Sequence, residues 1–202
     1  MSGPGWALPA AACAVLCAAC ALMAPANVET RSVVIDKLPP RVAHGASRSG
    51  TLLVLAPNVA PAYDTTRMAY STKPSEIGYF AHLQWGGRPS QMIQPLLVGT
   101  LRAAGAFGSV ESPPYTTGHV AYALRSELTE LRQDFTAVPP VLRFALHVEL
   151  DDEDHGRVLL ARDIAAEEPM ASATPEAGAA AANEAVARAL GELARRVIAA
   201  LG

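Results

Sequence analysis

The alternation of hydrophobic and polar positions is most regular in the last third of the chain. Residues 142–150 alternate apolar side chains with Arg143, Ala145, His147 and Glu149, which is typical of a β-strand with one covered face. The acidic segment 151–156 follows, and residues 157–165 return as the partner strand. The pattern therefore predicts a β-hairpin across 142–165.

Three shorter apolar runs also predict strands. Residues 51–57 form a buried strand that is ended by a proline, and residues 67–71 and 79–85 form a pair around a turn at 73–75. Residues 120–135 are ambiguous, because their leucines and Phe135 have helical spacing while residues 120–124 alternate like a strand. The residues alone leave that segment open.

Two helices are predicted from apolar residues at helical spacing. The first begins near Pro89, which suits a first helical turn, and stops at Gly105; Pro95 within it should kink the helix or delay its start. The second covers about 175–201 and is rich in alanine. Its expected buried stripe is Val186, Leu190, Leu193, Val197 and Leu201, and its expected chain of ion pairs at four-residue spacing is Glu184, Arg188, Glu192 and Arg196.

The N-terminal segment has a different character. No charged side chain precedes Glu29, and residues 6–23 are almost continuously apolar. Such a stretch is a secretory signal or a membrane span, and its high alanine content favours export with processing. Prolines and glycines then punctuate residues 21–50, which predicts an extended tether. A short run at 33–35 is expected to pair as an edge strand.

All three cysteines, Cys13, Cys17 and Cys20, lie in this apolar segment. The setting lacks the strand and helix that tune a redox pair, and it lacks the fourth ligand of a zinc site. Cys20 follows Ala19 as the lipid-bearing cysteine of a bacterial lipoprotein follows its cleavage site. We therefore expect a signal peptide over 1–19, a lipid-anchored tether over 20–50 and a domain over 51–202. An ordinary signal peptide or an uncleaved anchor is the alternative.

Composition and the absence of known motifs argue against several classes of function. The net charge is −3, and no cluster of lysine and arginine suits a nucleic-acid surface. The sequence contains no nucleophile elbow, phosphate loop, zinc-protease motif or dinucleotide fingerprint. The acidic segment 151–156 lacks the spacing of a calcium loop. We expect neither catalysis nor a bound metal or cofactor, apart from the lipid on Cys20.

The order of many weak motifs resembles one known family. The motifs are Tyr63-Asp64, 67–70, 77–80, Trp85, Pro89, the segment 105–107 with Val110, then 162–169 and Asn183. In this order and spacing they resemble the ABC-type transport auxiliary lipoproteins, the paraquat-inducible protein C-like family. The resemblance covers nearly all of residues 51–200.

That resemblance implies an α/β fold: a mixed β-sheet flanked by two main helices, similar to the N-terminal domain of TolB, with 120–135 as a strand. It also implies partners, namely an ABC permease, its ATPase and a periplasmic protein with a mammalian-cell-entry (MCE) domain, in a system that moves phospholipid or other hydrophobic cargo. A homo-oligomer is left open. Ala21, rather than Asp, after Cys20 favours the outer membrane.

Within this family resemblance the expected role is a non-catalytic periplasmic lipoprotein. Tyr70, Tyr79 and Trp85 are its candidate partner or ligand surface, with ordinary core packing as the alternative for these aromatic residues. The rival function is a soluble periplasmic binding protein that carries a lipid itself, which would require a deep apolar cavity.

Overall fold

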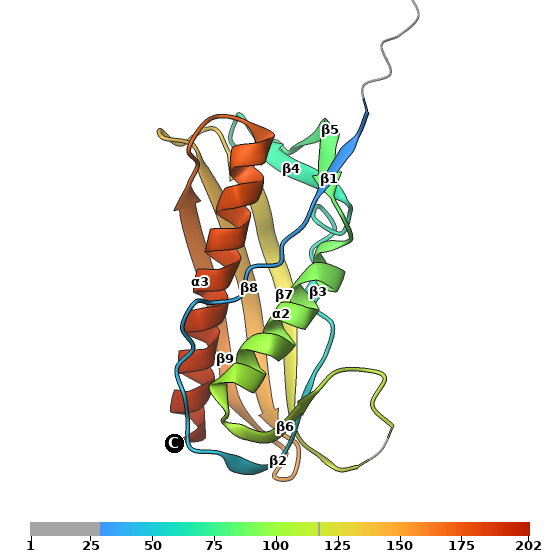
Figure 1. Cartoon of the computed structure of the whole chain (residues 1–202), viewed down its shortest axis with the longest axis vertical. Coiled ribbons are helices and arrows are strands. Elements are labelled where there is room, and N and C mark those ends of the chain that lie inside the picture. Colours follow the sequence, from blue (N-terminus) through green and yellow to red (C-terminus); the bar gives the residue numbers. More distant parts are fainter. Residues whose placement is uncertain (1–28, 117) are drawn as a thin grey trace, which may run out of the picture.

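One long strand, β7, organises the sheet in the computed structural model, which describes residues 29–116 and 118–202 (Figure 1). The described strands are β1 (Arg31–Val33), β2 (Arg48–Val54), β3 (Asn58–Val59), β4 (Arg67–Ser71), β5 (Gly78–Trp85), β6 (Phe107–Glu111), β7 (Val120–Asp134), β8 (Val141–Asp152) and β9 (Arg157–Pro169). The described helices are α2 (Pro89–Ala104) and α3 (Pro175–Leu201).

Strand β7 has a different set of partners on each edge. On one edge it pairs antiparallel with β8, which pairs antiparallel with β9. Along the other edge β2, β3 and β4 follow one another, each parallel to β7. Strand β6 then pairs with β2, β5 with β4, and β1 with β5. The nine strands form one mixed sheet, and the predicted hairpins 67–85 and 142–165 are both confirmed.

Residues 120–135 form a strand, as the family resemblance implied, and a bulge explains their helix-like spacing. The register of β7 against β8 shifts between Leu128 and Glu130. The core-facing positions therefore alternate as 124, 126 and 128 before the bulge and continue as 131 and 133 after it. An extra residue in a strand changes the phase of alternation. Leu128 and Leu131 thus stand three residues apart without any helix.

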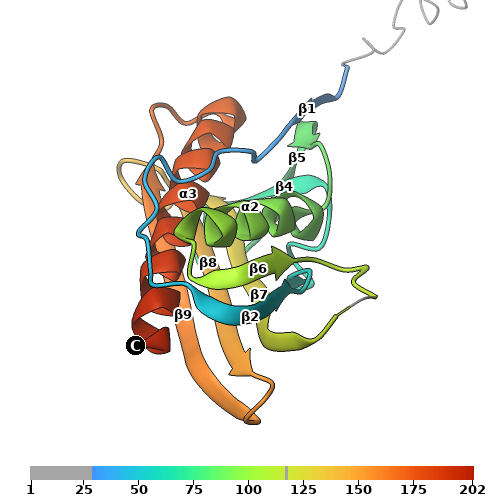
Figure 2. The same ribbon diagram turned by 60° about the horizontal axis from the view of Figure 1, so that its bottom comes forward.

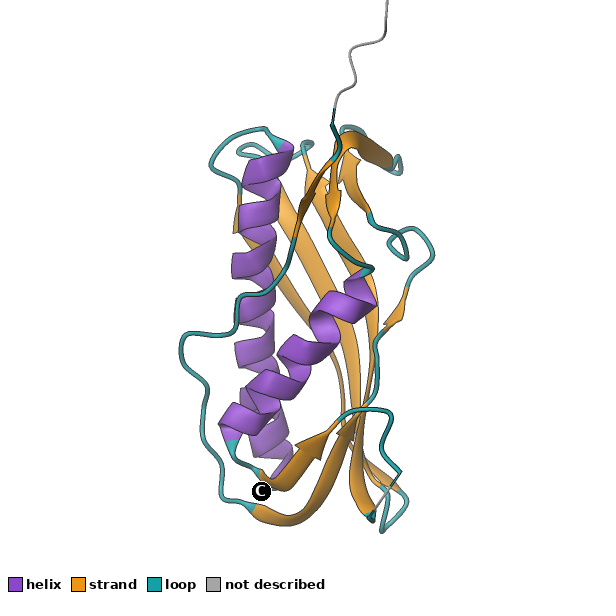
Figure 3. Cartoon of the chain, turned by 45° about the vertical axis from the view of Figure 1, so that its right-hand side comes forward, coloured by secondary structure: helices purple, strands orange, loops and turns teal. Residues whose placement is uncertain are grey.

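Both helices cover the same face of the sheet, and its other face carries none of the described helices (Figures 1 and 3). Helix α2 begins at Pro89 and ends at Gly105, whose φ of 64° suits glycine. Of the two effects expected of Pro95, the delayed start does not occur, because Pro95 lies on the exposed side inside a helix that has already begun, and the kink stays a prediction. Seen from below, α2 lies across the sheet above β6 and β2 (Figure 2).

Helix α3 spans 27 residues along β8 and β9. Thr174 caps it by accepting a hydrogen bond from the backbone N–H of Ala177. The expected stripe is buried, at Val186, Leu190, Leu193, Val197 and Leu201. The expected chain of ion pairs is mostly wrong: only Glu192 and Arg196 pair with each other. The partners of the other two lie elsewhere in the fold: Glu184 pairs with Lys37, and Arg188 with Glu168.

Residues 31–50 pack against the domain, so the expected boundary at residue 51 is too late. The edge strand predicted at 33–35 lies two residues earlier, as β1 (Arg31–Val33), parallel to β5. Beyond it Asn183 of α3 accepts hydrogen bonds from the backbone N–H groups of Asp36 and Lys37, both at 3.0 Å, and its Nδ2 donates to the Val34 carbonyl at 3.0 Å. Ile35 is buried in the core. We call residues 31–50 the strap.

The expected signal peptide, residues 1–19, and Cys20 lie outside the described residues. Within the part of the chain that the structure describes, no helix is both long enough and apolar enough to cross a membrane.

Candidate functional site

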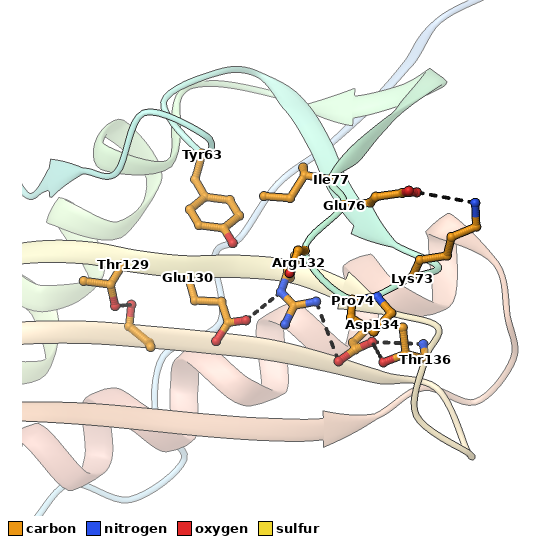
Figure 4. Close-up of a pocket in the computed structure, with 12 residues that line it drawn as sticks. Tyr63, Lys73, Pro74, Glu76, Ile77, Thr129, Glu130, Arg132, Asp134 and Thr136 are labelled. Atoms are coloured by element: carbon orange, nitrogen blue, oxygen red, sulfur yellow. Dashed lines mark hydrogen bonds and ion pairs between the residues drawn. The ribbon is translucent and has the colours of Figure 1, made fainter.

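The helix-free face of the sheet contains a pocket of about 620 Å³ at the end of β7 (Figure 4). Three segments enclose it: the outer side of β7, the turn that carries Tyr63, and the loop between β4 and β5. The pocket is lined by Tyr63, Lys73, Pro74, Ser75, Glu76, Ile77, Thr129, Glu130, Arg132, Asp134, Thr136 and Ala145. We call this the outer pocket.

The alternation of β7 explains the polar floor of the outer pocket. Leu131 and Gln133 face the helices, so Glu130, Arg132 and Asp134 face the other way. Arg132 lies directly opposite Arg143 of β8, and like charges in that position repel. Two arginines can remain paired there only if carboxylates lie between them.

Asp134 supplies one of those carboxylates. Its Oδ2 accepts a hydrogen bond from Arg143 Nε at 2.7 Å and lies 3.7 Å from Arg132 Nη1. Its Oδ1 accepts from the backbone N–H of Thr136 at 2.9 Å and from the Thr136 hydroxyl at 2.5 Å. Burial would raise the pKa of Asp134, but the hydrogen bonds from Thr136 and Arg143 outweigh it and hold the pKa far below its ordinary value. Asp134 is therefore ionised.

The charged side chains around Asp134 also have partners. Arg132 Nε donates to Glu130 at 2.6 Å, and Arg132 also donates to the Ser71 hydroxyl at the end of β4. Arg143 pairs with Glu167 of β9. Burial, followed by the nearby charge of Glu130, raises the pKa of the Tyr63 hydroxyl. The network thus links β4, β7, β8 and β9.

This arrangement suits contact better than proton transfer. A general acid or base works best with a pKa near the working pH. Asp134 is instead held ionised, Tyr63 is held protonated, and the two arginines are neutralised by carboxylates. The outer pocket offers a fixed pattern of charges beside the half-exposed Ile77.

The three aromatic residues predicted to form a surface lie in three different environments. Tyr79 is paired across the hairpin with Ala69, and Tyr70 with Gly78, so the two tyrosines lie on opposite faces of the sheet. Trp85 is only 3% exposed and belongs to the core. The structure therefore does not bring Tyr70, Tyr79 and Trp85 together.

Each tyrosine has local partners of its own. Tyr70 packs with Phe80 and Phe135, at ring-centroid distances of 4.7 and 6.2 Å, on the side that carries the helices. Tyr79 donates a hydrogen bond to the Ala62 carbonyl at 2.9 Å and lies beneath the guanidinium of Arg67. A role for either tyrosine in ligand or partner binding stays a prediction.

The acidic turn after β8 forms ion pairs within the fold. His155 and Arg157 contact Asp152, and His119 contacts Asp154. Among the described residues, no group of three histidine, cysteine, aspartate or glutamate side chains is placed to hold a metal ion.

The fold and the order of the motifs agree with the sequence comparisons. The chain belongs to the family described as the ABC-type transport auxiliary lipoprotein component, whose model matches residues 35–194. That match begins within the strap. No match was found among curated proteins.

Solved structures show the same fold at low sequence identity. Protein XCC0632 from Xanthomonas campestris is 20% identical, with a TM-score of 0.70 over 84% of this chain and 94% of that one. The hypothetical protein CT253 from Chlamydia trachomatis is 12% identical, with a TM-score of 0.53 over 76% of this chain and 98% of that one. The expected similarity to TolB is not tested by these structures and stays a prediction.

Proposed function

We propose that this protein is a non-catalytic periplasmic lipoprotein that docks with an MCE-type ABC transport system, which moves phospholipid or other hydrophobic cargo between the membranes. The observation that carries the proposal is the family match over residues 35–194. Cys20 would carry the lipid, and the outer membrane would hold the anchor. The MCE-domain protein, the permease and the ATPase are the proposed partners.

The nature of the outer pocket supports docking over carriage of a lipid. A carrier needs an apolar cavity that covers most of its ligand. The outer pocket instead has charged side chains along its floor, among them Glu130, Arg132 and Asp134. On the opposite face, Leu52, Ile93, Leu97, Leu190 and other buried side chains fill the space between the helices and the sheet.

Lipidation is tested by growing cells with a clickable fatty acid and comparing the wild type with Cys20→Ser. The wild type should be labelled and should require detergent for extraction, whereas the variant should be neither labelled nor retained. Equal absence of label in both, with release by salt washing, would show that Cys20 is not an anchor.

Docking is tested by purifying the tagged full chain from detergent-solubilised envelopes. Mass spectrometry should find the MCE-domain protein and the permease in the eluate, and lipid analysis should find less than one bound phospholipid per chain. A purified chain that carries stoichiometric phospholipid without either partner would establish the carrier function instead.

A further inference from the structure

One end of the domain gathers three loops that are poor in charge. The Cα partners Ser71, Asp134, Val141 and Pro169 form a single row across β4, β7, β8 and β9. Each loop starts or ends at this row, so the loops 72–77, 135–140 and 170–174 lie at the same end of the sheet. Figure 1 shows this end at the top, together with the start of α3.

The composition of these loops differs from that of an ordinary solvated surface. Residues 135–140 and 170–174 contain no ionisable side chain, and residues 72–77 contain only Lys73 and Glu76, which lie 3.8 Å apart. The same end exposes large apolar side chains: Val138 is 98% exposed and Ile77 is 42% exposed. A valine at the tip of an uncharged loop has no packing role within this domain.

The opposite end has the reverse character. The end of β8 and the turn after it carry Asp151, Asp152, Glu153 and Asp154 in succession, against which Arg125 and Arg157 place only two positive charges. Anionic lipid headgroups repel such a turn. The domain is therefore polarised along its length. At one end, which we call the neutral end, the loops carry exposed apolar tips and the charged side chains beside them are paired, Arg31 with Glu176 and Asp134 with Arg143, whereas the other end carries more carboxylates than arginines.

The N-terminal chain approaches the neutral end. Strand β1 runs parallel to β5, and β5 begins beside the row at Gly78. The start of β1 therefore points toward the neutral end, and Figure 1 shows β1 in the upper part of the domain, on the same side as this end. Ten residues separate Cys20 from Arg31, and fully extended they reach at most about 35 Å. Helix α3, with its 27 residues, is about 40 Å long, so a lipid on Cys20 holds the domain within its own length of the bilayer.

We infer that the neutral end faces the lipid bilayer, with Val138 and Ile77 at the level of the headgroups, and that the acidic turn points away from it. This inference rests on the proposed anchoring through Cys20. The occupant of the neutral end is thus the surface of the membrane that holds the anchor, and the far end with its acidic turn stays free to meet other components.

Two positions of the same residue type at opposite ends make a matched pair for the test. In the processed chain Cys13 and Cys17 are removed and the lipid blocks the thiol of Cys20, so Val138→Cys and Val158→Cys each provide one site for an environment-sensitive fluorophore. The first site lies at the neutral end, and the second lies beside the acidic turn, where Val158 is 55% exposed. Each labelled full chain is reconstituted in vesicles of phosphatidylethanolamine and phosphatidylglycerol that contain a spin-labelled lipid. Mass spectrometry of the same samples reports whether Cys20 carries lipid.

The expected result is a blue shift and a several-fold stronger quenching by the spin-labelled lipid at position 138 than at position 158. A lipidated chain with equal quenching at both positions overturns this inference and leaves the proposed function standing. A label at position 138 that is shielded from water but not quenched by lipid shows that a protein covers this end, and also overturns it. A chain without lipid and without quenching overturns both the inference and the proposed anchor.

Discussion

Gly178 of α3 approaches Gln133 of β7 so closely that a Cβ atom at position 178 would lie 2.0 Å from the Gln133 side-chain carbon Cδ. Gln133 cannot move aside freely, because it is 1% exposed and its Nε2 donates to the Pro175 carbonyl at 3.2 Å. The absence of a side chain at residue 178 therefore sets how deeply the start of α3 packs onto the sheet.

Gly178→Ala is expected to destabilise the fold. Overpacking costs about 1–3 kcal/mol, which exceeds the gain in helix propensity of up to about 1 kcal/mol. The measurement is the free energy of unfolding from urea titration. Gly191→Ala is the matched control in the same helix, since its Cβ would lie 3.7 Å from the nearest atom, on Pro39. The control should be neutral or more stable, and equal stability of the two variants would contradict the close approach.

Asp134→Asn should weaken the junction of β4, β7 and β8. The substitution keeps the size of the side chain but removes the charge between Arg132 and Arg143, and breaking a buried charged network costs about 2 kcal/mol or more. Thermal and urea unfolding measure the loss. Asp163→Asn is the control, because Asp163 has an 85% exposed side chain and pairs only with His147. If Asp134→Asn loses no more stability than Asp163→Asn, Asp134 does not stabilise the junction of β4, β7 and β8.

The low pKa of Asp134 also predicts how the stability of the fold changes as the pH falls. The pKa of Asp134 in the folded protein lies below its value of about 4 in an unfolded chain. Its contribution to stability is therefore complete above about pH 4 and is lost as the pH falls further. Between pH 7 and pH 3, the wild type should lose more stability than Asp134→Asn does. Parallel losses in the two proteins would show that another group dominates the acid response.

Asn183→Ala should release the strap without unfolding the domain. The substitution removes the acceptor of the Asp36 and Lys37 N–H groups and the donor to the Val34 carbonyl. Each such hydrogen bond contributes about 1 kcal/mol, so hydrogen exchange at residues 34–37 should accelerate at least tenfold, while β8 and α3 keep their protection. Glu184→Ala removes only the exposed pair with Lys37 and should change exchange little. Unchanged hydrogen exchange at residues 34–37 in Asn183→Ala would show that Asn183 does not hold the strap in place.

The elements set by local pattern could be predicted from the sequence. In the hairpin 142–165 and in helix α3, the hydrophobic periodicity can be recognised within the segment itself, and the structure confirms both elements. Residues 120–135 could not be assigned from their own pattern, because the bulge after Leu128 is fixed by pairing with β8. The strap was expected to be an extended tether with one short edge strand, because its prolines and glycines carry no sign of the hydrogen bonds that Asn183 of α3 forms with it.

The candidate site required the register between strands. Arg132 and Asp134 carry no motif, and they meet Arg143 only because β7 and β8 pair as they do. The one signal in the sequence was that Arg132 and Asp134 lie two residues apart, which places them on the same side of a strand. In the same way, the register of the β4–β5 hairpin separates Tyr70 from Tyr79 onto opposite faces, which their nearness in sequence does not indicate.

The strap also has a mechanical consequence. If the chain is pulled from its N-terminus, the force first loads the hydrogen bonds between β1 and β5 along the strand direction and then the three bonds of Asn183. The backbone bonds from Gly45 to the Ala104 carbonyl and from Arg48 to the Ala106 carbonyl are the next attachments along the strap. Once detached up to Arg48, where β2 begins, residues 31–47 would span at most about 60 Å. The domain could then remain folded while its distance from the attachment point grows, so the strap acts as a reserve of tether length.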